Sequence, residues 1–525
     1  DLQRLIRARE LSAVEVTRAH IGRIESVNPA INAFRHQKNL YSDTVYYFLT
    51  VGGTGARIPS SNATGSPSVT TNQFLYRYAH ELDTVNLLSS GKEWYGEEFT
   101  DAPGKTLTRS FTLPGSFLQG NPVTVRSRLI ARSIGTAGRF DLKLNDPIIA
   151  QITIPATSSG AYDLFAREEE SVVATTTAPS SALTLSYSYV PGSFNSQAWL
   201  NWFEIFHRKP LNLTGLTQLD FRDPGLVGQS LVEFVLSGAN ASVQVWEVTN
   251  PLSPVRKTGT LNGNEFRFRD EAPDLREYIA FQGYLTPTAQ GRIANQDIHG
   301  LAVPDYILVA PPFLLTQANR LAQYHRQRNQ WQVAVLSTNE IYQEFSSGQP
   351  DPSAIRNCVK MFYDRARSAG GTTPRFLALF GDASFDYKNR LQGNTNLVPG
   401  YQHSASLDPL STYTSDDFFG YLDDQEDINS QAITNLLDIG IGRIPANQIS
   451  QATAYVDKVL AYHDRASLGP WRNKITFIAD DEDQNLHIED AEIGGILRQG
   501  FQGRCPVAVG ADLVTFRLER HTERG

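Results

Sequence analysis

The chain has 525 residues, of which 41% are hydrophobic and 19% charged, and its formal net charge at pH 7 is −8. This composition is typical of a globular protein with several domains and excludes a disordered or coiled-coil chain. Because 47 basic residues face 55 acidic ones without forming a basic stripe, we expect no nucleic-acid partner. No apolar run of the sequence approaches the roughly 20 residues of a membrane-spanning helix.

Residues 1–35 are expected to form a helical segment. Apolar residues recur at helical spacing between positions 2 and 27, and Ser12 and Glu15 have the spacing of a capping box. Asn28 and Pro29 then predict the end of the helix. Charged residues are spread through the first ten positions, so we expect no secretory signal peptide there.

Residues 36–300 have the pattern of β-sandwich domains. Short alternating runs, separated by Gly, Pro, Ser and Asn, occur for example at 44–51, 123–131 and 183–189. Two units fit this pattern, a β-sandwich domain at 36–215 and a second β domain at 216–300.

Two runs inside this region support more specific predictions. The apolar runs 232–236 and 243–248 flank Ser-Gly-Ala-Asn, which predicts a β-hairpin. The aromatic run at 199–206 predicts a core strand, with ligand binding as the alternative.

Residues 301–470 change to an α/β pattern, with a further strand after them. Nearly uniform apolar strands alternate with helices, which indicates a parallel sheet covered on both faces. The expected strands are 306–310, 331–336, 376–380, 437–441 and 474–479, and the expected helices are 316–329, 352–369 and 448–462.

Acidic residues follow these strands, where α/β sheets bind their ligands. Clustered carboxylates in glycine-rich loops suit Ca²⁺, which takes six to eight oxygen ligands. Solvated loop acids and Asp residues that cap helices explain the same pattern, and a catalytic carboxylate pair is the least favoured interpretation. The candidate calcium ligands are Asp382, Asp386, Asp416, Asp417 and Asp480.

Only two cysteines occur, Cys358 and Cys505, so the sequence predicts no disulfide framework. Cys358 lies in a helical pattern, and we expect it to be a small buried hydrophobic residue. Cys505 lies in a turn-like Gly-Arg-Cys-Pro sequence that no histidine-containing turn precedes, and we do not expect it to act as a nucleophile.

Several motifs between residues 37 and 492 occur in the order found in the gingipain family of cysteine peptidases. The α/β region and its flanking strands resemble that family, and in particular its members that act as sortases of the type IX secretion system. The motifs include Gly-Lys-Glu-Trp-Tyr-Gly-Glu at 91–97, Trp-Leu-Asn-Trp-Phe-Glu at 199–204, Leu-Phe-Gly-Asp-Ala-Ser-Phe-Asp at 379–386, Thr-Ser-Asp-Asp at 414–417 and Ile-Gly-Ile-Gly-Arg-Ile-Pro at 439–445.

The resemblance implies a caspase-like fold with a first subdomain at 301–470 and a second that begins at 471–492. Such proteins are cysteine endopeptidases. The sortases among them remove a C-terminal signal domain from secreted proteins at the outer membrane, so the implied partners are protein substrates and outer-membrane secretion components at the cell surface. In the Gly-Arg-Ile-Pro element, Arg443 is placed to bridge loop carboxylates.

The sequence departs from the family after residue 492, and residues 493–525 form a non-matching tail. The family's Gly-His-Gly turn and its strand ending in Cys are absent, and His521 follows Cys505 instead of preceding a nucleophile. We therefore assign no catalytic residue and expect a truncated, inactive peptidase with an incomplete α/β domain. Asn485 falls near the family's specificity position, where it would favour a neutral or small side chain.

Two other functions remain open. Residues 1–35 resemble the first helices of the amidase signature family, but the Ser-Ser-Lys arrangement of that family does not follow, so amidase activity is not expected. The alternative of a different class is a non-enzymatic cell-surface module whose β-sandwiches bind a protein or a glycan.

Overall fold

The computed structural model describes residues 38–49, 57–175, 178, 180–430 and 435–469, together with Arg472, Leu486 and Glu489. The predicted helical segment 1–35, the strand at 474–479 and the tail 493–525 lie outside the described residues. The chain divides into two compact units, Asp1–Asn447 and Gln448–Gly525. The elements below belong to the first unit unless stated otherwise.

The first β domain is a two-layer sandwich. One sheet has the order β3 (Gln73–Glu81), β11 (Gln197–Pro210), β6 (Val123–Arg132) and β9 (Arg167–Thr175), with β4 (Glu98–Phe99) also paired to β11. The other sheet has the order β5 (Thr108–Thr112), β10 (Thr184–Val190), β7 (Gly138–Leu144) and β8 (Ile148–Ile154).

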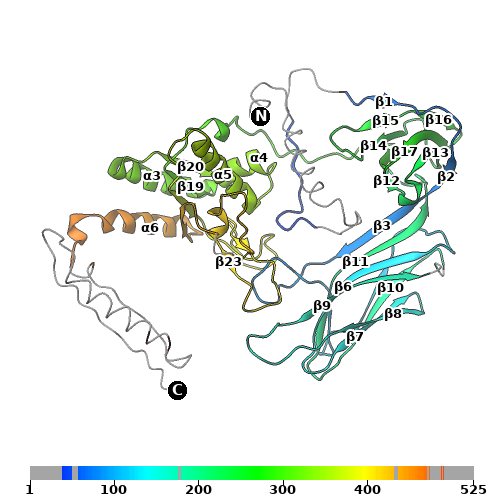
Figure 1. The fold of residues 1–525 in the computed structure, drawn as a ribbon, viewed down its shortest axis with the longest axis horizontal. Helices are drawn as coiled ribbons and strands as arrows, with labels where there is room; N and C mark the ends of the chain where they lie inside the picture. The colour runs from blue at the N-terminus through cyan, green and yellow to red at the C-terminus, as the bar shows by residue number, and fades with distance from the viewer. Residues whose placement is uncertain are drawn as a thin grey trace. The chain divides into compact units, whose positions relative to one another are not determined.

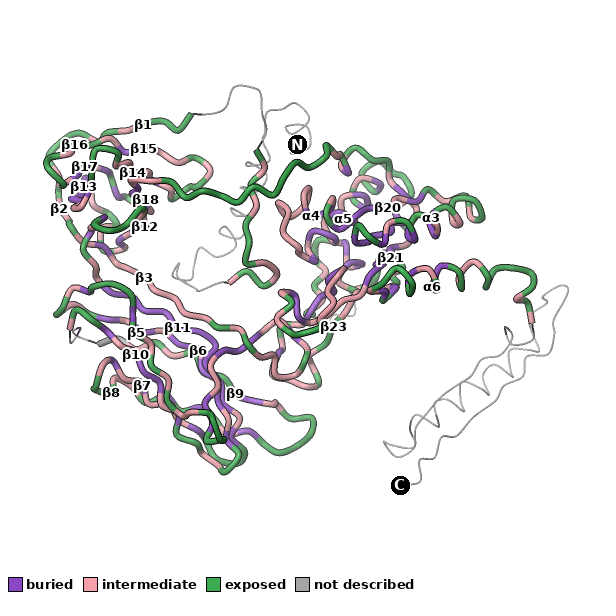
Figure 2. Tube along the Cα trace, turned by 180° about the vertical axis from the view of Figure 1, so that it is seen from behind, coloured by how far each residue is buried: buried purple, intermediate pink, exposed green. Residues whose placement is uncertain are grey.

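The core of this sandwich follows from the alternation of the sequence. Buried and partly exposed residues alternate along β6 and β7, so one face of each strand is buried. Leu129, Leu142, Leu185 and Phe203, from four strands of the two sheets, share one hydrophobic core. Strand β11 is buried over most of its length, as Figure 2 shows, which confirms that the aromatic run at 199–206 is a core strand.

The second β domain is also a two-layer sandwich. One sheet has the order β16 (Gly259–Asn262), β17 (Glu265–Ala272), β13 (Gln229–Leu236) and β2 (Val69–Thr71). The other has the order β1 (Ser60–Ser61), β15 (Val255–Lys257), β14 (Gln244–Glu247), β18 (Glu277–Phe281) and β12 (Gln218–Arg222). Val232, Phe268, Val245 and Tyr278 from the two sheets meet in its core.

The hairpin predicted for 232–248 is wrong. Strands β13 and β14 belong to different sheets, and the loop between them carries the chain from one layer to the other. After β13 the backbone bonds to an earlier segment instead: Ser237 donates to the carbonyl of Leu211, and Leu213 donates to the carbonyl of Ser237. Gly238 then turns with φ of 68°, where an added Cβ would meet the backbone of Thr214.

The alternating run at 44–51 is not a strand over its described part, residues 44–49. Val45, Tyr47 and Leu49 are exposed, and no strand pairs with them in the described structure. The Gln349 side chain donates to the carbonyl of Thr44 at 2.9 Å. Alternation alone is therefore insufficient here, because a strand also needs a partner for its backbone groups.

The α/β domain contains a parallel sheet of order β20 (Val333–Ser337), β19 (Tyr306–Ala310), β21 (Phe376–Phe380) and β24 (Gly440–Ile444). Figure 1 shows helices α3 (Leu315–Asn329), α4 (Thr338–Phe345) and α5 (Pro352–Ser368) beside these strands. The strands predicted at 306–310, 331–336 and 376–380 are confirmed. The one predicted at 437–441 begins three residues later.

Local sequence signals explain the helix starts. Ser337 and Glu340 form the capping box of α4, and the Asp351 carboxylate accepts from the Ser353 amide at the start of α5. The buried face of α5 carries Ile355, Val359 and Phe362. Helix α6 (Ile449–Tyr462) lies in the second unit and matches the helix expected at 448–462.

The remaining elements are short. They are β22 (Tyr401–Gln402), β23 (Thr414–Ser415), the 3₁₀ helices η1 (Pro224–Leu226), η2 (Ile298–Gly300), η3 (Pro312–Leu314) and η4 (Asp417–Phe419), and, in the second unit, η5 (Arg465–Ser467). No helix among the described residues has the length and hydropathy required to cross a membrane.

Candidate functional site

The candidate site lies at the carboxyl ends of β21 and β24, which are adjacent parallel strands. Open α/β sheets bind their ligands at this edge. The long loop after β21 begins with Gly381 and Asp382, and β24 ends with Arg443 and Ile444. Of the predicted calcium ligands, Asp382 therefore lies directly at this edge of the sheet.

Arg443 connects the loops at this edge. Its guanidinium donates two hydrogen bonds to the Asp416 carboxylate, at 2.6 and 2.8 Å. Its Nη1 also donates to the carbonyls of Gly381, at 2.9 Å, and Val398, at 2.7 Å. The prediction that Arg443 bridges to a loop carboxylate is confirmed for Asp416, and the four bonds fix the loop after β21 to strand β24.

Asp382 binds its own loop instead of pointing freely into solvent. Its carboxylate accepts from the Thr395 hydroxyl at 2.5 Å and from the Ala383 amide at 3.0 Å. Its backbone carbonyl accepts from the amides of Leu397 and Val398. The loop therefore folds back on itself directly after the strand end.

Asp386 is fully buried. Its Oδ2 accepts from the Leu391 amide at 2.7 Å, and Arg390 lies 3.6 Å from its Oδ1. Arg390 also donates to Asp83 at 2.8 Å and lies over the ring of Trp94. The buried carboxylate is thus part of a charged chain that joins the loop after β21 to the segment after β3.

The motif at 91–97 also contacts the long segment that follows β21. The Lys92 amide donates to the carbonyl of His403 at 3.0 Å, and the Glu93 amide donates to the Ser406 hydroxyl at 2.9 Å. The Trp94 ring stacks on Phe385 with centroids 5.8 Å apart. The sequence analysis did not predict Arg390 or Trp94 as site residues. A signal was available, because Trp94 lies inside the motif at 91–97 and Arg390 follows shortly after the motif at 379–386.

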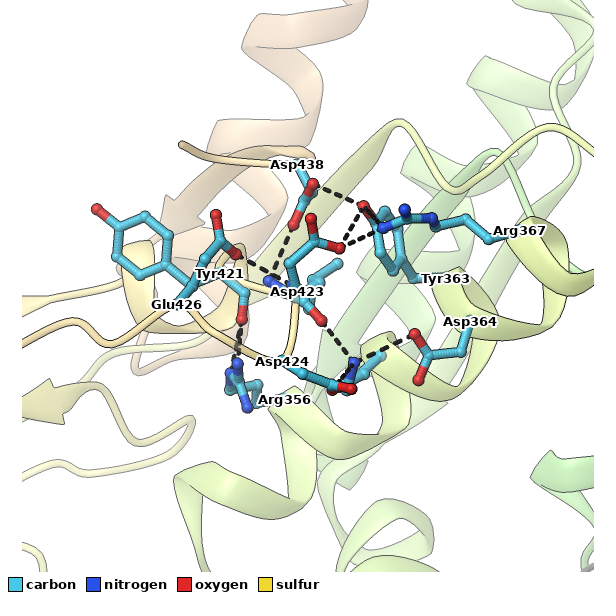
Figure 3. A network of polar contacts seen from close by, with 11 residues as sticks. Arg356, Tyr363, Asp364, Arg367, Tyr421, Asp423, Asp424, Glu426 and Asp438 are labelled. Carbon is cyan, nitrogen blue, oxygen red and sulfur yellow. Dashed lines mark hydrogen bonds and ion pairs between the residues drawn. The ribbon is translucent and has the colours of Figure 1, made fainter. Parts of the chain in front are cut away.

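A network on α5 holds the chain that leads into β24 (Figure 3). Lys360 donates to the carbonyl of Leu422 at 2.6 Å, and the Tyr363 hydroxyl donates to Asp438 at 2.7 Å. Asp438 in turn accepts from the Leu422 amide at 3.0 Å. The backbone amide of Asp438 donates to the carbonyl of Gly420 at 3.0 Å, so this part of the chain bonds outside the sheet and β24 begins only at Gly440.

The calcium hypothesis stays a prediction. Asp417 is exposed at the start of η4, Asp416 is paired with Arg443, and Asp480 lies outside the described residues. Within the described ranges, no group of three or more His, Cys, Asp or Glu side chains lies close enough together to hold a metal ion. Asn485, the proposed specificity residue, also lies outside them.

The thiol of Cys358 is fully buried on α5, in the core beside Ile355 and Phe362. Burial, with a smaller contribution from the Glu344 charge, raises the pKa of this thiol far above its usual range. A nucleophilic cysteine needs the opposite, a lowered pKa and access to substrate. The prediction of a buried hydrophobic role is confirmed; Cys505 and His521 lie outside the described residues.

The part of the chain that contains this edge of the sheet is similar to a peptidase family. Residues 300–503 match the model of peptidase family C25. The structure is similar to the dimeric latent PorU from Porphyromonas gingivalis, with 25% sequence identity and a TM-score of 0.66. The match covers 79% of this chain and 40% of the PorU chain, so this chain spans less than half of that relative's length.

Other solved structures resemble only part of the chain. A carbohydrate-binding module CBM36 in complex with calcium and xylotriose is 12% identical, with a TM-score of 0.15, over 24% of this chain and 98% of that chain. A C-terminal CBM6 of LamC from Zobellia galactanivorans is 12% identical, with a TM-score of 0.15, over 25% and 98%. Similarities this weak carry no argument about function. No curated protein matches the chain.

Proposed function

We propose that this chain is the scaffold region of a gingipain-like cysteine peptidase of the PorU type, a sortase of type IX secretion. The observation that carries the proposal is the structural similarity to PorU over 79% of the chain, together with the C25 match at 300–503. The parallel sheet with loops assembled at its carboxyl edge supports it. The partners would be secreted proteins with a C-terminal signal domain and outer-membrane secretion components, at the cell surface.

Arg443 has a scaffolding role in this proposal. Peptide cleavage by a cysteine peptidase requires a thiolate, a histidine that transfers protons and backbone N–H donors for the oxyanion. Such groups must be held within fractions of an ångström, which needs rigid loops around them. The four hydrogen bonds of Arg443 would supply that rigidity on the β21–β24 side.

We further infer that these 525 residues do not cleave peptides by themselves. Cys358 is buried, which raises the pKa of its thiol, and neither Cys505 nor His521 has the flanking sequence of the family's catalytic residues. The test is incubation of the whole chain with a panel of peptides and with a thiol-directed acyloxymethyl ketone. We expect no turnover and no labelling; labelling of Cys505 that His521→Ala abolishes would contradict this inference.

The assignment to secretion has a separate test. A secreted protein that carries a C-terminal signal domain is immobilised, and binding of the chain is compared with binding to the same protein without that domain. We expect binding that depends on the domain. Equal binding to both proteins would overturn the assignment and leave the inference about peptide cleavage unaffected.

A further inference from the structure

A cavity of about 260 Å³ lies within the first unit, and its wall includes none of Asp382, Asp386, Asp416 and Arg443. Lys92, from the segment after β3, forms one part of its wall. Ser353 and Arg356 come from the first two turns of α5, Tyr401 from β22 and Phe418 from η4. The cavity therefore combines two cationic side chains with aromatic rings.

The two rings stack on each other, and one cation lies over each ring. The Lys92 ammonium lies 4.3 Å from the centre of the Tyr401 ring and 3.2 Å from its hydroxyl. The Tyr401 ring stacks on Phe418 with centroids 4.8 Å apart. The Arg356 guanidinium lies 5.5 Å from the centre of the Phe418 ring. Cation–π contacts at such distances hold both charges against the aromatic wall.

Neither cation is neutralised by a direct partner. In the described part of the chain, no ion pair within 4 Å joins Lys92 or Arg356 to a carboxylate. Arg356 instead donates through Nε to the carbonyl of Tyr421 at 2.8 Å, as Figure 3 shows. Burial lowers the pKa of Lys92 and of Arg356, and the opposing effect of nearby acids does not offset it.

The two carboxylates of the wall, Glu426 and Asp427, act on the cations through space, Asp427 on Lys92 and Glu426 on Arg356, but neither contacts a cation. Glu426 accepts from the backbone amides of Asp423 and Leu436. Asp427 accepts from the backbone amide and the side-chain amide of Asn429. These bonds hold the loop 421–430 in place and leave the two cations facing the cavity without a carboxylate in contact.

We propose that this cavity binds a carboxylate group of a peptide, presented by an acidic side chain or by the C-terminal carboxylate of an aromatic residue. Lys92 and Arg356 supply the positive charge, and Tyr401 and Phe418 supply a flat apolar surface. A singly charged carboxylate fits better than a phosphate dianion, because Glu426 and Asp427 share the same wall. The volume matches a group about the size of one residue, below the usual range of drug-sized pockets. The proposal does not depend on peptidase activity.

The probe is N-acetyl-L-phenylalanine, with its amide as the uncharged analogue, titrated onto the whole chain by calorimetry. We expect the acid to bind at least about tenfold more tightly than the amide, as for a charge-assisted contact. Lys92→Met should remove that preference. Lys105→Met, at an exposed lysine paired with Glu98, is the matched control and should keep it.

A second pair of variants guards against misfolding of Lys92→Met. Ser353 lies in the wall and in the first turn of α5, where a carboxylate is compatible with the helix dipole. Ser353→Asp should weaken binding of the acid by about tenfold and leave the amide unaffected, whereas Ser353→Asn should change neither. Equal affinity for acid and amide, no binding of the acid at millimolar concentration, or unchanged acid binding in Ser353→Asp would overturn the proposal.

Discussion

Arg443 and Asp416 form a two-bonded ion pair with 14% and 24% of their side chains exposed, although 27 residues separate them along the chain. The pair joins strand β24 to the end of the long loop after β21. Two further bonds from the same guanidinium hold the carbonyls of Gly381 and Val398. One side chain therefore fixes three points of the candidate site.

We predict that Arg443→Met loosens this loop. Loss of the guanidinium leaves the Asp416 carboxylate and two carbonyls without their donors, which should cost on the order of 2–3 kcal/mol. Hydrogen exchange at the Leu397 and Val398 amides, which bond to Asp382, is the measurement. Arg367→Met is the control, because its ion pair with Asp423 is exposed and should matter little. Unchanged exchange in Arg443→Met would show that the loop is held by other contacts.

We predict that Cys358 does not react in the folded protein. In a Cys505→Ser chain Cys358 is the sole thiol, and it is fully buried with a raised pKa. A disulfide reagent should therefore find no thiol at neutral pH in the native chain and one after denaturation, because the thiolate is the reactive form. Rapid labelling of the native variant would contradict both the burial and the structural role of this residue.

We predict a pH-dependent contribution of Lys209 to stability. Burial lowers its pKa to about 8, against about 10.4 for an ordinary lysine. Its ammonium donates to the carbonyl of Pro114 and lies 3.5 Å from the centre of the Tyr76 ring. Between these two pKa values the unfolded chain binds more protons than the folded chain, so its contribution to the free energy of unfolding rises with pH.

The measurement for Lys209 is a comparison of melting temperatures. The melting temperature of the unmodified chain, relative to Lys209→Met, should increase between pH 8 and pH 10 and stay constant below about pH 8. A difference that does not vary with pH over this window would mean that the folded-state pKa of Lys209 is ordinary.

Calcium binding by the acidic loops makes a prediction of its own. If the ion binds only the folded chain, millimolar Ca²⁺ should raise the melting temperature, and a chelator should reverse the effect. Asp417→Asn should reduce the rise, because the Asp417 side chain is exposed while Asp416 is already paired with Arg443. A melting temperature that changes neither with calcium nor with the chelator would contradict the calcium hypothesis.

The sequence predicts those parts of the fold in which a local pattern is sufficient. Strand β19 falls where the apolar run predicts it, at Tyr306–Ala310, because a strand buried on both faces needs no information about its neighbours. The hairpin at 232–248 fails for the opposite reason. The alternation shows which residues are buried but not which sheet a strand joins.

The Arg443 site and the Lys92–Arg356 cavity likewise differ in how far a local sequence pattern predicts them. Arg443 could be predicted to bridge a loop carboxylate because it lies in a recognisable motif at a strand end. The pairing of Lys92 with Arg356 across one cavity could not be predicted, since 264 residues separate them in the sequence and the motif that contains Lys92 does not point to Arg356. Such sites arise when the folded chain brings distant segments together.

The course of the chain through the two sandwiches has a consequence for folding order. Strands β1 and β2 precede the first sandwich in the chain yet pair with β15 and β13 of the second, so that Ser68 bonds to Leu231 across 163 residues. Closing so long a loop is entropically costly and slow. The first sandwich removes most of that cost once it has formed, because its two ends meet where the Leu211 amide donates to the carbonyl of Asn72. The second sandwich should therefore complete its sheets only after the first has folded, and an isolated fragment 216–300 should lack two of its edge strands.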